Sequence, residues 1–147
     1  MDEKMTKPTE EQIPPRAVHW QLLFAHIPYF ETRPITPWRQ AKPEGERIAL
    51  SYPEYSDEMR RFISDFYSSE AADDDYMVTI ERSGIRSHGS FADAIPTANK
   101  RLLRAMLTCY IRQERYHEGL LAKAAQSGAL AALLKRLRSL AEGECAG

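Results

Sequence analysis

The spacing of apolar residues along the chain predicts a protein built mainly from helices. The clearest pattern covers residues 56–68, where apolar side chains recur every three or four positions: Met59, Phe62, Ile63, Phe66 and Tyr67. Ser56 precedes this run as a good N-cap, and Asp57 and Glu58 follow it in the first turn, where the helix dipole favours negative charge. We therefore expect an amphipathic helix over 56–68.

A longer helix is predicted over residues 98–116, with two chemically different faces. On a helical wheel one face is apolar: Leu102, Leu103, Met106, Leu107, Cys109, Tyr110 and Ile111. The opposite face carries Arg101, Arg104, Thr108, Arg112 and Arg115. The pattern predicts a buried ridge and, behind it, a row of four arginines that faces solvent or a partner.

Three further helices are predicted from the same periodicity. The first covers 16–30 and is ended or kinked by Pro28, a short one covers 120–126 and stops at Ser127-Gly128, and the last covers 129–141. The last helix has leucines on one side and three basic residues on the other: Lys135, Arg136 and Arg138.

The remaining segments are less regular. Prolines make 32–53 an irregular connection, in which 48–50 is a possible short extended piece and Trp38 is expected to fold back onto the core. Residues 73–85 fit either a strand or a short helix, and we choose the helix because Ser83-Gly84-Ile85 resembles a helix stop. Residues 86–95 are expected to form a loop.

Together these elements predict an all-α fold, a single compact domain of five or six helices with a long proline-rich loop after the first helix. Its boundaries are predicted as a tail over 1–14, the domain over 15–142 and a second tail over 143–147. The chain of 147 residues has no apolar run long enough for a membrane span and an N-terminus too polar for a signal peptide. Its two cysteines, Cys109 (buried) and Cys145 (exposed), favour a reducing cytoplasm.

Charge is distributed unevenly along the chain. Residues 100–138 contain nine basic and two acidic residues, near +7, whereas the rest is near −8, and the two parts give the net charge of −1. This asymmetry indicates an acidic partner, nucleic acid, or the acidic half of the molecule itself.

The most concentrated polar motif is the cluster Arg112, Arg115, Tyr116, His117 and Glu118. Its arginines suit a phosphate or carboxylate, and His117 or Glu118 suits proton transfer, which together would make a small phosphate-handling enzyme or hydrolase. The simpler interpretation is a basic helix end followed by a left-handed turn at Gly119. In that case Arg112 and Arg115 pair with acids of the second helix.

A nucleic-acid surface is the second alternative. It would use Arg101, Arg104, Arg112, Arg115, Lys135, Arg136 and Arg138, since phosphate contacts need clustered Lys and Arg. The pI of 6.4 and the lack of aromatic or amide side chains on this face count against it.

Metal and cofactor chemistry have little support. His19 and His26 are two helical turns apart, too far to share one ion, and Asp73-Asp74-Asp75 lacks the rest of a calcium loop. The chain has no phosphate-binding or dinucleotide glycine motif. We expect no metal and no cofactor.

Three motifs resemble a small bacterial family that carries only a domain-of-unknown-function label. They are Ile27-Pro28-Tyr29-Phe30, Tyr55-Ser56-Asp57-Glu58, and the run from Arg112 to Gly119, which is similar to the pattern Arg-x-x-Arg-aromatic-x-x-Gly-His. Leu120 stands at the histidine position, so a catalytic role of that histidine would not be shared. The resemblance covers about 18–140 and implies a fold and a bacterial origin without an activity.

The sequence does not decide whether the chain is an enzyme, and the balance favours a non-enzyme. We expect a small cytoplasmic protein-protein interaction module that docks to an unknown protein partner or to itself as a homo-oligomer. Nucleic acid is a less favoured partner, and no membrane is expected. Candidate binding residues are Arg101, Arg104, Arg112, Arg115, Tyr116, His117, Lys135, Arg136 and Arg138.

Overall fold

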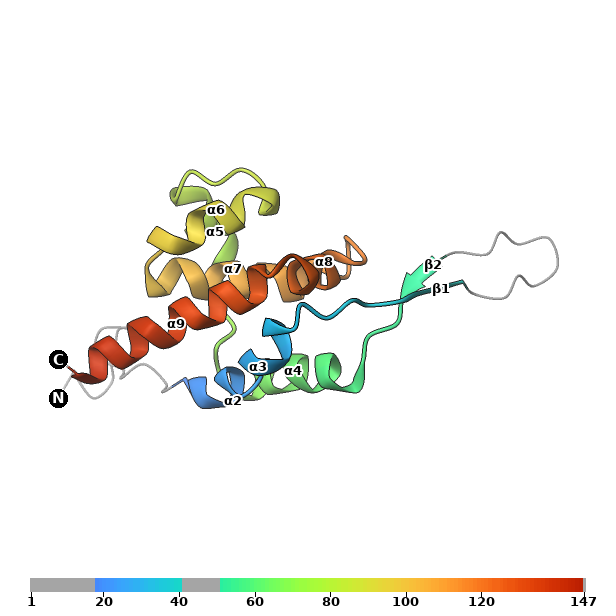
Figure 1. The fold of residues 1–147 in the computed structure, drawn as a ribbon. Coiled ribbons are helices and arrows are strands. Elements are labelled where there is room, and N and C mark those ends of the chain that lie inside the picture. The colour runs from blue at the N-terminus through green and yellow to red at the C-terminus, as the bar shows by residue number, and fades with distance from the viewer. Residues whose placement is uncertain (1–17, 41–50, 147) are drawn as a thin grey trace, which may run out of the picture.

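The chain is described here by a computed structural model that covers residues 18–40 and 51–146, with side chains up to Glu142. Helices dominate this part of the chain, and a two-stranded sheet accompanies them (Figure 1). The all-α fold class is therefore confirmed. The expected tail over 1–14 and the extended piece at 48–50 lie outside the described residues. None of the described helices has the length and apolarity to cross a bilayer.

Each expected helix is present, with shifted ends. The helices are α2 (Trp20–Phe24), α3 (Ile27–Glu31), α4 (Asp57–Ser68), α5 (Tyr76–Arg82), α6 (Phe91–Ala94), α7 (Lys100–Gln113), α8 (Leu120–Ser127) and α9 (Ala129–Ala146). The predicted helix over 16–30 is divided, since a turn at Ala25 and His26 separates α2 from α3. The last helix continues past 141 to Ala146.

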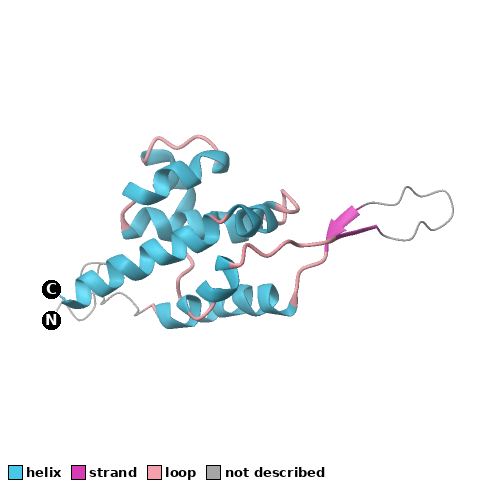
Figure 2. Cartoon of the chain, in the orientation of Figure 1, coloured by secondary structure: helices cyan, strands magenta, loops and turns pink. Residues whose placement is uncertain are grey.

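Two predicted loops contain regular structure. The 86–95 segment was expected to be a loop, but it holds α6 between two 3-10 turns, His88–Ser90 and Ile95–Thr97, because Phe91 and Ile95 bury their side chains in the core. The 32–53 connection was expected to be irregular, but β1 (Trp38–Gln40) pairs antiparallel with β2 (Ser51–Pro53). This pair forms an arm that extends away from the helices (Figure 2).

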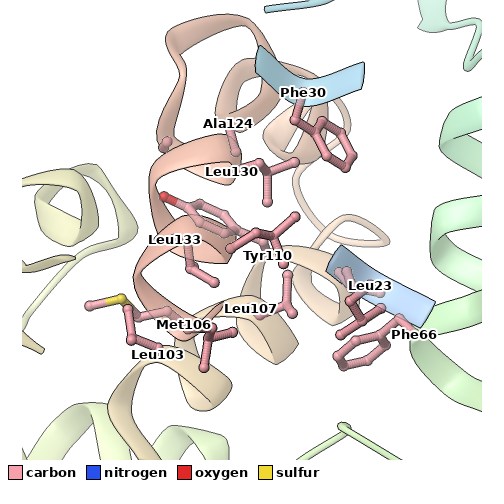
Figure 3. Close-up of a cluster of buried hydrophobic side chains, with 14 of the residues drawn as sticks. Leu23, Phe30, Phe66, Leu103, Met106, Leu107, Tyr110, Ala124, Leu130 and Leu133 are labelled. Carbon is pink, nitrogen blue, oxygen red and sulfur yellow. The ribbon is translucent and has the colours of Figure 1, made fainter. Parts of the chain in front are cut away.

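Helices α7 and α9 form the centre of the fold. In Figure 1, α9 crosses the molecule between α5, α6 and α7 on one side and α2, α3 and α4 on the other. It packs against α2, α3, α6, α7 and α8. The apolar ridge predicted for α7 is buried, with Leu103, Met106 and Leu107 fully inaccessible to solvent. Their side chains meet those of Leu130 and Leu133 of α9, as Figure 3 shows.

Local signals in the sequence set the helix ends. The Ser56 hydroxyl accepts a hydrogen bond from the Met59 amide at 3.1 Å, and the Asn99 side chain accepts one from Leu102 at 2.8 Å. Gly84 has a φ of +86° at the end of α5, as its predicted role as a helix stop requires. These caps satisfy backbone groups that an unprotected helix end would leave without partners.

Two left-handed glycines bracket α8, and both lie under side chains from the segment that leads to the arm. Gly119 has φ +91°, and a Cβ added there would lie 2.5 Å from Cζ2 of Trp38. Gly128 has φ +90°, and its Cβ would lie 2.8 Å from Nε of Arg33. Trp38 was expected to fold onto the core. It instead remains 52% exposed and lies with the six-membered ring of its indole against Gly119.

A buried histidine connects α3 to α4. His26 is 3% exposed, with Nδ1 2.6 Å from Glu58 Oε2 and Nε2 2.7 Å from Asp65 Oδ2. The two acids are seven residues apart and therefore share one face of α4. A ring that carries both protons donates a hydrogen bond to each carboxylate. The edge of the ring also contacts Phe62, with the ring centroids 5.3 Å apart.

The contact at Gly119 predicts a specific difference between two glycine substitutions. Gly119→Ala and Gly84→Ala both place a side chain at a positive φ, which costs about 1–3 kcal/mol, but only Gly119 has a neighbour within 4 Å. We expect Gly119→Ala to lower the free energy of unfolding, measured with urea, by clearly more than Gly84→Ala. The excess should disappear in a Trp38→Ala background. Equal costs in the wild-type background would contradict the contact.

The histidine bridge predicts a large cost for its removal. We expect His26→Ala to reduce the free energy of unfolding by about 3 kcal/mol, because two carboxylates lose a buried partner. His19→Ala, at the exposed N-cap position of α2, is the control and should stay within about 0.5 kcal/mol because no side-chain cap hydrogen bond forms there. Urea unfolding measures both, and a His26→Ala cost as small as that of the control would rule the bridge out.

Candidate functional site

A groove of about 980 Å³ lies beside α8. We call it the α8 groove. Its apolar lining comes from α6, α7, α8 and α9 and consists of Ala92, Tyr110, Leu120, Ala122, Ala124 and Ala129. Its polar and aromatic lining consists of Thr36, Trp38, His88, His117, Glu118, Lys123, Gln126 and Ser127. The groove therefore joins an apolar surface to a cluster of basic side chains.

The carboxylate of Glu114 fixes the start of α8. It accepts hydrogen bonds from the Gly119 amide at 2.8 Å and from the Leu121 amide at 2.9 Å. The partial positive charge of this helix end is thus balanced from within the chain. Burial and the neighbouring charge of Glu114 raise the pKa of the Tyr55 hydroxyl, so the phenol is protonated at neutral pH.

Two imidazoles and a lysine meet at one side of the groove. His88 and His117 are in edge-to-face contact, with ring centroids 5.2 Å apart. Burial, followed by the positive charges of His117 and Lys123, lowers the pKa of His88 below 6.5. No described carboxylate forms an ion pair with these three residues. The basic side of the groove is therefore not neutralised by an ion pair with a carboxylate of the described residues.

The predicted 112–118 cluster is divided in the structure. Arg112 forms an ion pair with Asp74 at 3.1 Å and lies over the ring of Tyr76. Asp74 precedes α5, so the expected pairing of Arg112 with an acid of the second helix, now α4, is wrong. The acids Glu58 and Asp65 of α4 hold His26 instead.

The other members of the cluster also separate. The guanidinium of Arg115 lies over the ring of Tyr116, which is 70% exposed, and neither residue lines a described groove. Only His117 and Glu118 reach the α8 groove. The structure therefore does not gather Arg112, Arg115 and His117 around one cavity.

The arginine row of α7 is not a uniform solvent face. Arg101 is exposed, but Arg104 is half-buried and donates hydrogen bonds to the carbonyl oxygens of Ala71 at 2.7 Å, Ala72 at 3.1 Å and Glu70 at 3.2 Å. Thr108 is fully buried and accepts a hydrogen bond from the Asp73 amide. The segment before α5 covers this part of the helix, which the wheel could not show.

The basic residues of α9 have partners within the molecule. Lys135 pairs with Glu31 of α3 at 2.8 Å. Arg136 donates a hydrogen bond to the carbonyl oxygen of Ala98 at 3.2 Å. Arg138 lies 4.0 Å from Glu142, one turn further along the helix. Three of the predicted binding residues therefore contact groups of the same chain.

Three residues of the α8 groove were not predicted from the sequence as site residues. His88 was placed in a loop without a partner, Lys123 was not considered for a site, and Trp38 was assigned to the core. Nothing in the local pattern pairs residue 88 with residue 117, because the contact joins segments 29 positions apart in sequence. Gly119 was the one residue whose predicted role, a left-handed turn, lies at this groove.

A second, smaller groove of about 570 Å³ lies between α5, the 84–88 segment and α7. Met77, Ile80, Ile85 and Phe91 give it an apolar lining, and His88 belongs to both grooves. Burial raises the pKa of the Cys109 thiol at its base to about 11, so this sulfur is not a reactive thiolate at neutral pH. No three potential metal ligands come together among the described residues.

The comparison with protein families gives one result. A model described as "Family of unknown function (DUF6508)" matches residues 15–143. No curated protein and no solved structure matches the chain.

The contacts of Arg104 predict that it stabilises the fold. We expect Arg104→Ala to reduce the free energy of unfolding by about 2 kcal/mol, because three carbonyl oxygens lose a charged donor. Arg101→Ala, at an exposed position on the same helix, should change it by less than about 0.5 kcal/mol. Denaturant unfolding of the two variants measures the difference, and equal effects would mean that the hydrogen bonds of Arg104 contribute nothing.

Proposed function

The chain belongs to this family of unknown function, whose description carries no activity, and we propose from the geometry that it is a protein-protein interaction module. The docking surface is the α8 groove, and its occupant is a short segment of a partner protein. One observation supports this most: the groove combines an apolar lining with basic side chains, and no described side chain fills it. Clefts of about 300–1,000 Å³ with this mixed lining are typical of binding sites.

The aromatic side chain at the rim supports docking as well. Trp38 lines the groove and is 52% exposed, and its position is fixed by its contact with Gly119. Tryptophan is enriched among the residues that contribute most to binding at protein interfaces. An indole whose conformation is already restricted can bury its exposed apolar surface on binding with little further loss of side-chain entropy. The use of cysteine in the chain favours the cytoplasm as the place of this interaction.

The enzyme alternative has less support. A phosphate-handling site or hydrolase would need Arg112, Arg115 and His117 around one concave surface. Arg112 pairs with Asp74, Arg115 lies over Tyr116, and His117 faces His88. The three side chains therefore do not converge on one concave surface.

The nucleic-acid alternative is also weaker than it was from the sequence. Of the seven basic residues that it would use, Arg104, Arg112, Lys135 and Arg136 bind carbonyl oxygens or carboxylates of this chain. A gel shift with random-sequence duplex DNA and with single-stranded RNA tests it. A complex that forms at 50 mM salt and weakens steeply toward 200 mM would favour nucleic acid over a protein partner.

Filling the groove tests the docking proposal directly. Random 12-residue peptides displayed on phage are selected against the immobilised full chain, and the affinities of enriched peptides are measured by fluorescence anisotropy. We expect Ala92→Trp to weaken binding at least about tenfold, equal to about 1.4 kcal/mol, because Ala92 is exposed and lines the groove. Ala132→Trp, at an exposed alanine of α9, is the matched control and should bind as the wild type does.

Two results would overturn the proposal. The first is a selection that enriches no peptide, despite repeated rounds on the folded protein. The second is a set of peptides that bind the Ala92→Trp variant and the wild type equally, which would place docking elsewhere on the surface.

A further inference from the structure

We infer that the α8 groove recognises an acidic peptide segment and that a carboxylate of the segment is held among His88, His117 and Lys123. The inference rests on the proposed docking function and specifies the chemistry of its occupant. The three side chains come from three different places in the fold: the 3-10 turn His88–Ser90, the turn between α7 and α8, and α8 itself. The fold brings them to the same groove.

The electrostatics of the three groups favour an anion. The two imidazoles are in contact, and Lys123 is close enough for its charge to act on His88. Like charges gathered without a counter-ion are unfavourable, so an added carboxylate would stabilise the protonated rings. The charges that act on His88 are those of His117 and Lys123, and Glu118 also lines the groove. Neither imidazole forms an ion pair with a carboxylate of the described residues, so a carboxylate from a partner can take that place.

The carboxylate of a peptide fits better than a phosphate of nucleic acid. The amides of Gly119 and Leu121, which could have formed a phosphate site at the start of α8, are already bound to Glu114. Next to the basic cluster the lining is apolar, with Leu120, Ala122 and Ala124. A segment that carries Asp or Glu beside apolar side chains matches both parts of the groove.

This recognition would depend on pH in a defined direction. The charged and titratable groups that line the two grooves with the pair are Lys123, Glu118, Arg86 and Tyr110. Burial raises the pKa of the Tyr110 phenol to about 12, so it carries no charge in this range. The pKa of His88 is lowered below 6.5, so the free ring is neutral at pH 7. A bound carboxylate favours the protonated ring, so binding takes up a proton and strengthens as pH falls. The carboxylate itself stays ionised down to about pH 5.

The experiment uses two display libraries that differ in one respect. One library contains all amino acids, and the other omits Asp and Glu. Binders are selected on the full chain at pH 6.0, and their affinities are measured by the fluorescence anisotropy of dye-labelled peptides. We define groove binders as peptides that bind the wild type but not the Ala92→Trp variant. We expect such peptides only from the library that contains Asp and Glu.

Variants of the three residues identify the anchor. We expect Lys123→Ala to weaken binding of the acidic peptides about tenfold, equal to about 1.4 kcal/mol. Lys135→Ala is the control, because its ammonium pairs with Glu31 away from the groove. The wild type should bind several-fold more tightly at pH 5.5 than at pH 8.0, and the double variant His88→Ala/His117→Ala should lose this dependence.

The outcomes separate the two proposals. Equal groove binders from both libraries would overturn the carboxylate anchor while leaving docking in the groove intact. An absence of groove binders from both libraries would overturn the docking function and the anchor with it. Acidic peptides that bind Lys123→Ala and the double histidine variant as tightly as the wild type, at both pH values, would also overturn the anchor.

Discussion

The left-handed turn at Gly119 is the constraint on which the functional surface depends. A positive φ of +91° lets the chain reverse between α7 and α8, and the missing side chain lets the Trp38 indole lie directly on the backbone. The same turn directs the amides of Gly119 and Leu121 toward Glu114. The start of α8, the contact of Trp38 and two of the three basic side chains depend on this turn, because His117 precedes the glycine by two residues and Lys123 follows it by four.

The uneven charge of the chain is explained largely by contacts inside the molecule. Lys135 of α9 pairs with Glu31 of α3, and Arg112 of α7 pairs with Asp74 before α5. Arg104 holds the backbone of the segment that follows α4. Of the three partners that the charge asymmetry indicated, the acidic part of the molecule itself accounts for Lys135 and Arg112. Lys123 and the two imidazoles have no such ion pair among the described residues.

The fold was predictable from the sequence wherever local patterns decide structure. The apolar positions of 56–68 and 98–116 gave the buried faces of α4 and α7, and Ser56 and Gly84 gave helix ends. The arm was not predictable, because pairing of Trp38–Gln40 with Ser51–Pro53 joins segments that show no strand pattern of their own. Short strands depend on their partner more than on their own sequence.

The candidate site was predicted only in part, for a similar reason. His117 was identified from the motif around Gly119, but its partner His88 lies 29 residues earlier in a segment with no periodicity. His26 was judged by its distance along the helix from His19, whereas its structural partners are Glu58 and Asp65 of α4. Contacts between side chains that are distant in sequence produce no regular spacing, so sequence periodicity cannot predict them.

The position of Trp38 on Gly119 is the most direct test of the account. Nuclear Overhauser effects between the indole Hζ2 proton of Trp38 and the α protons of Gly119 measure it in solution. We expect strong cross-peaks between these protons in the wild type, because the indole lies against the glycine. Their absence, with the Gly119 α protons at the chemical shifts of an unstructured glycine, would contradict the central role of this turn.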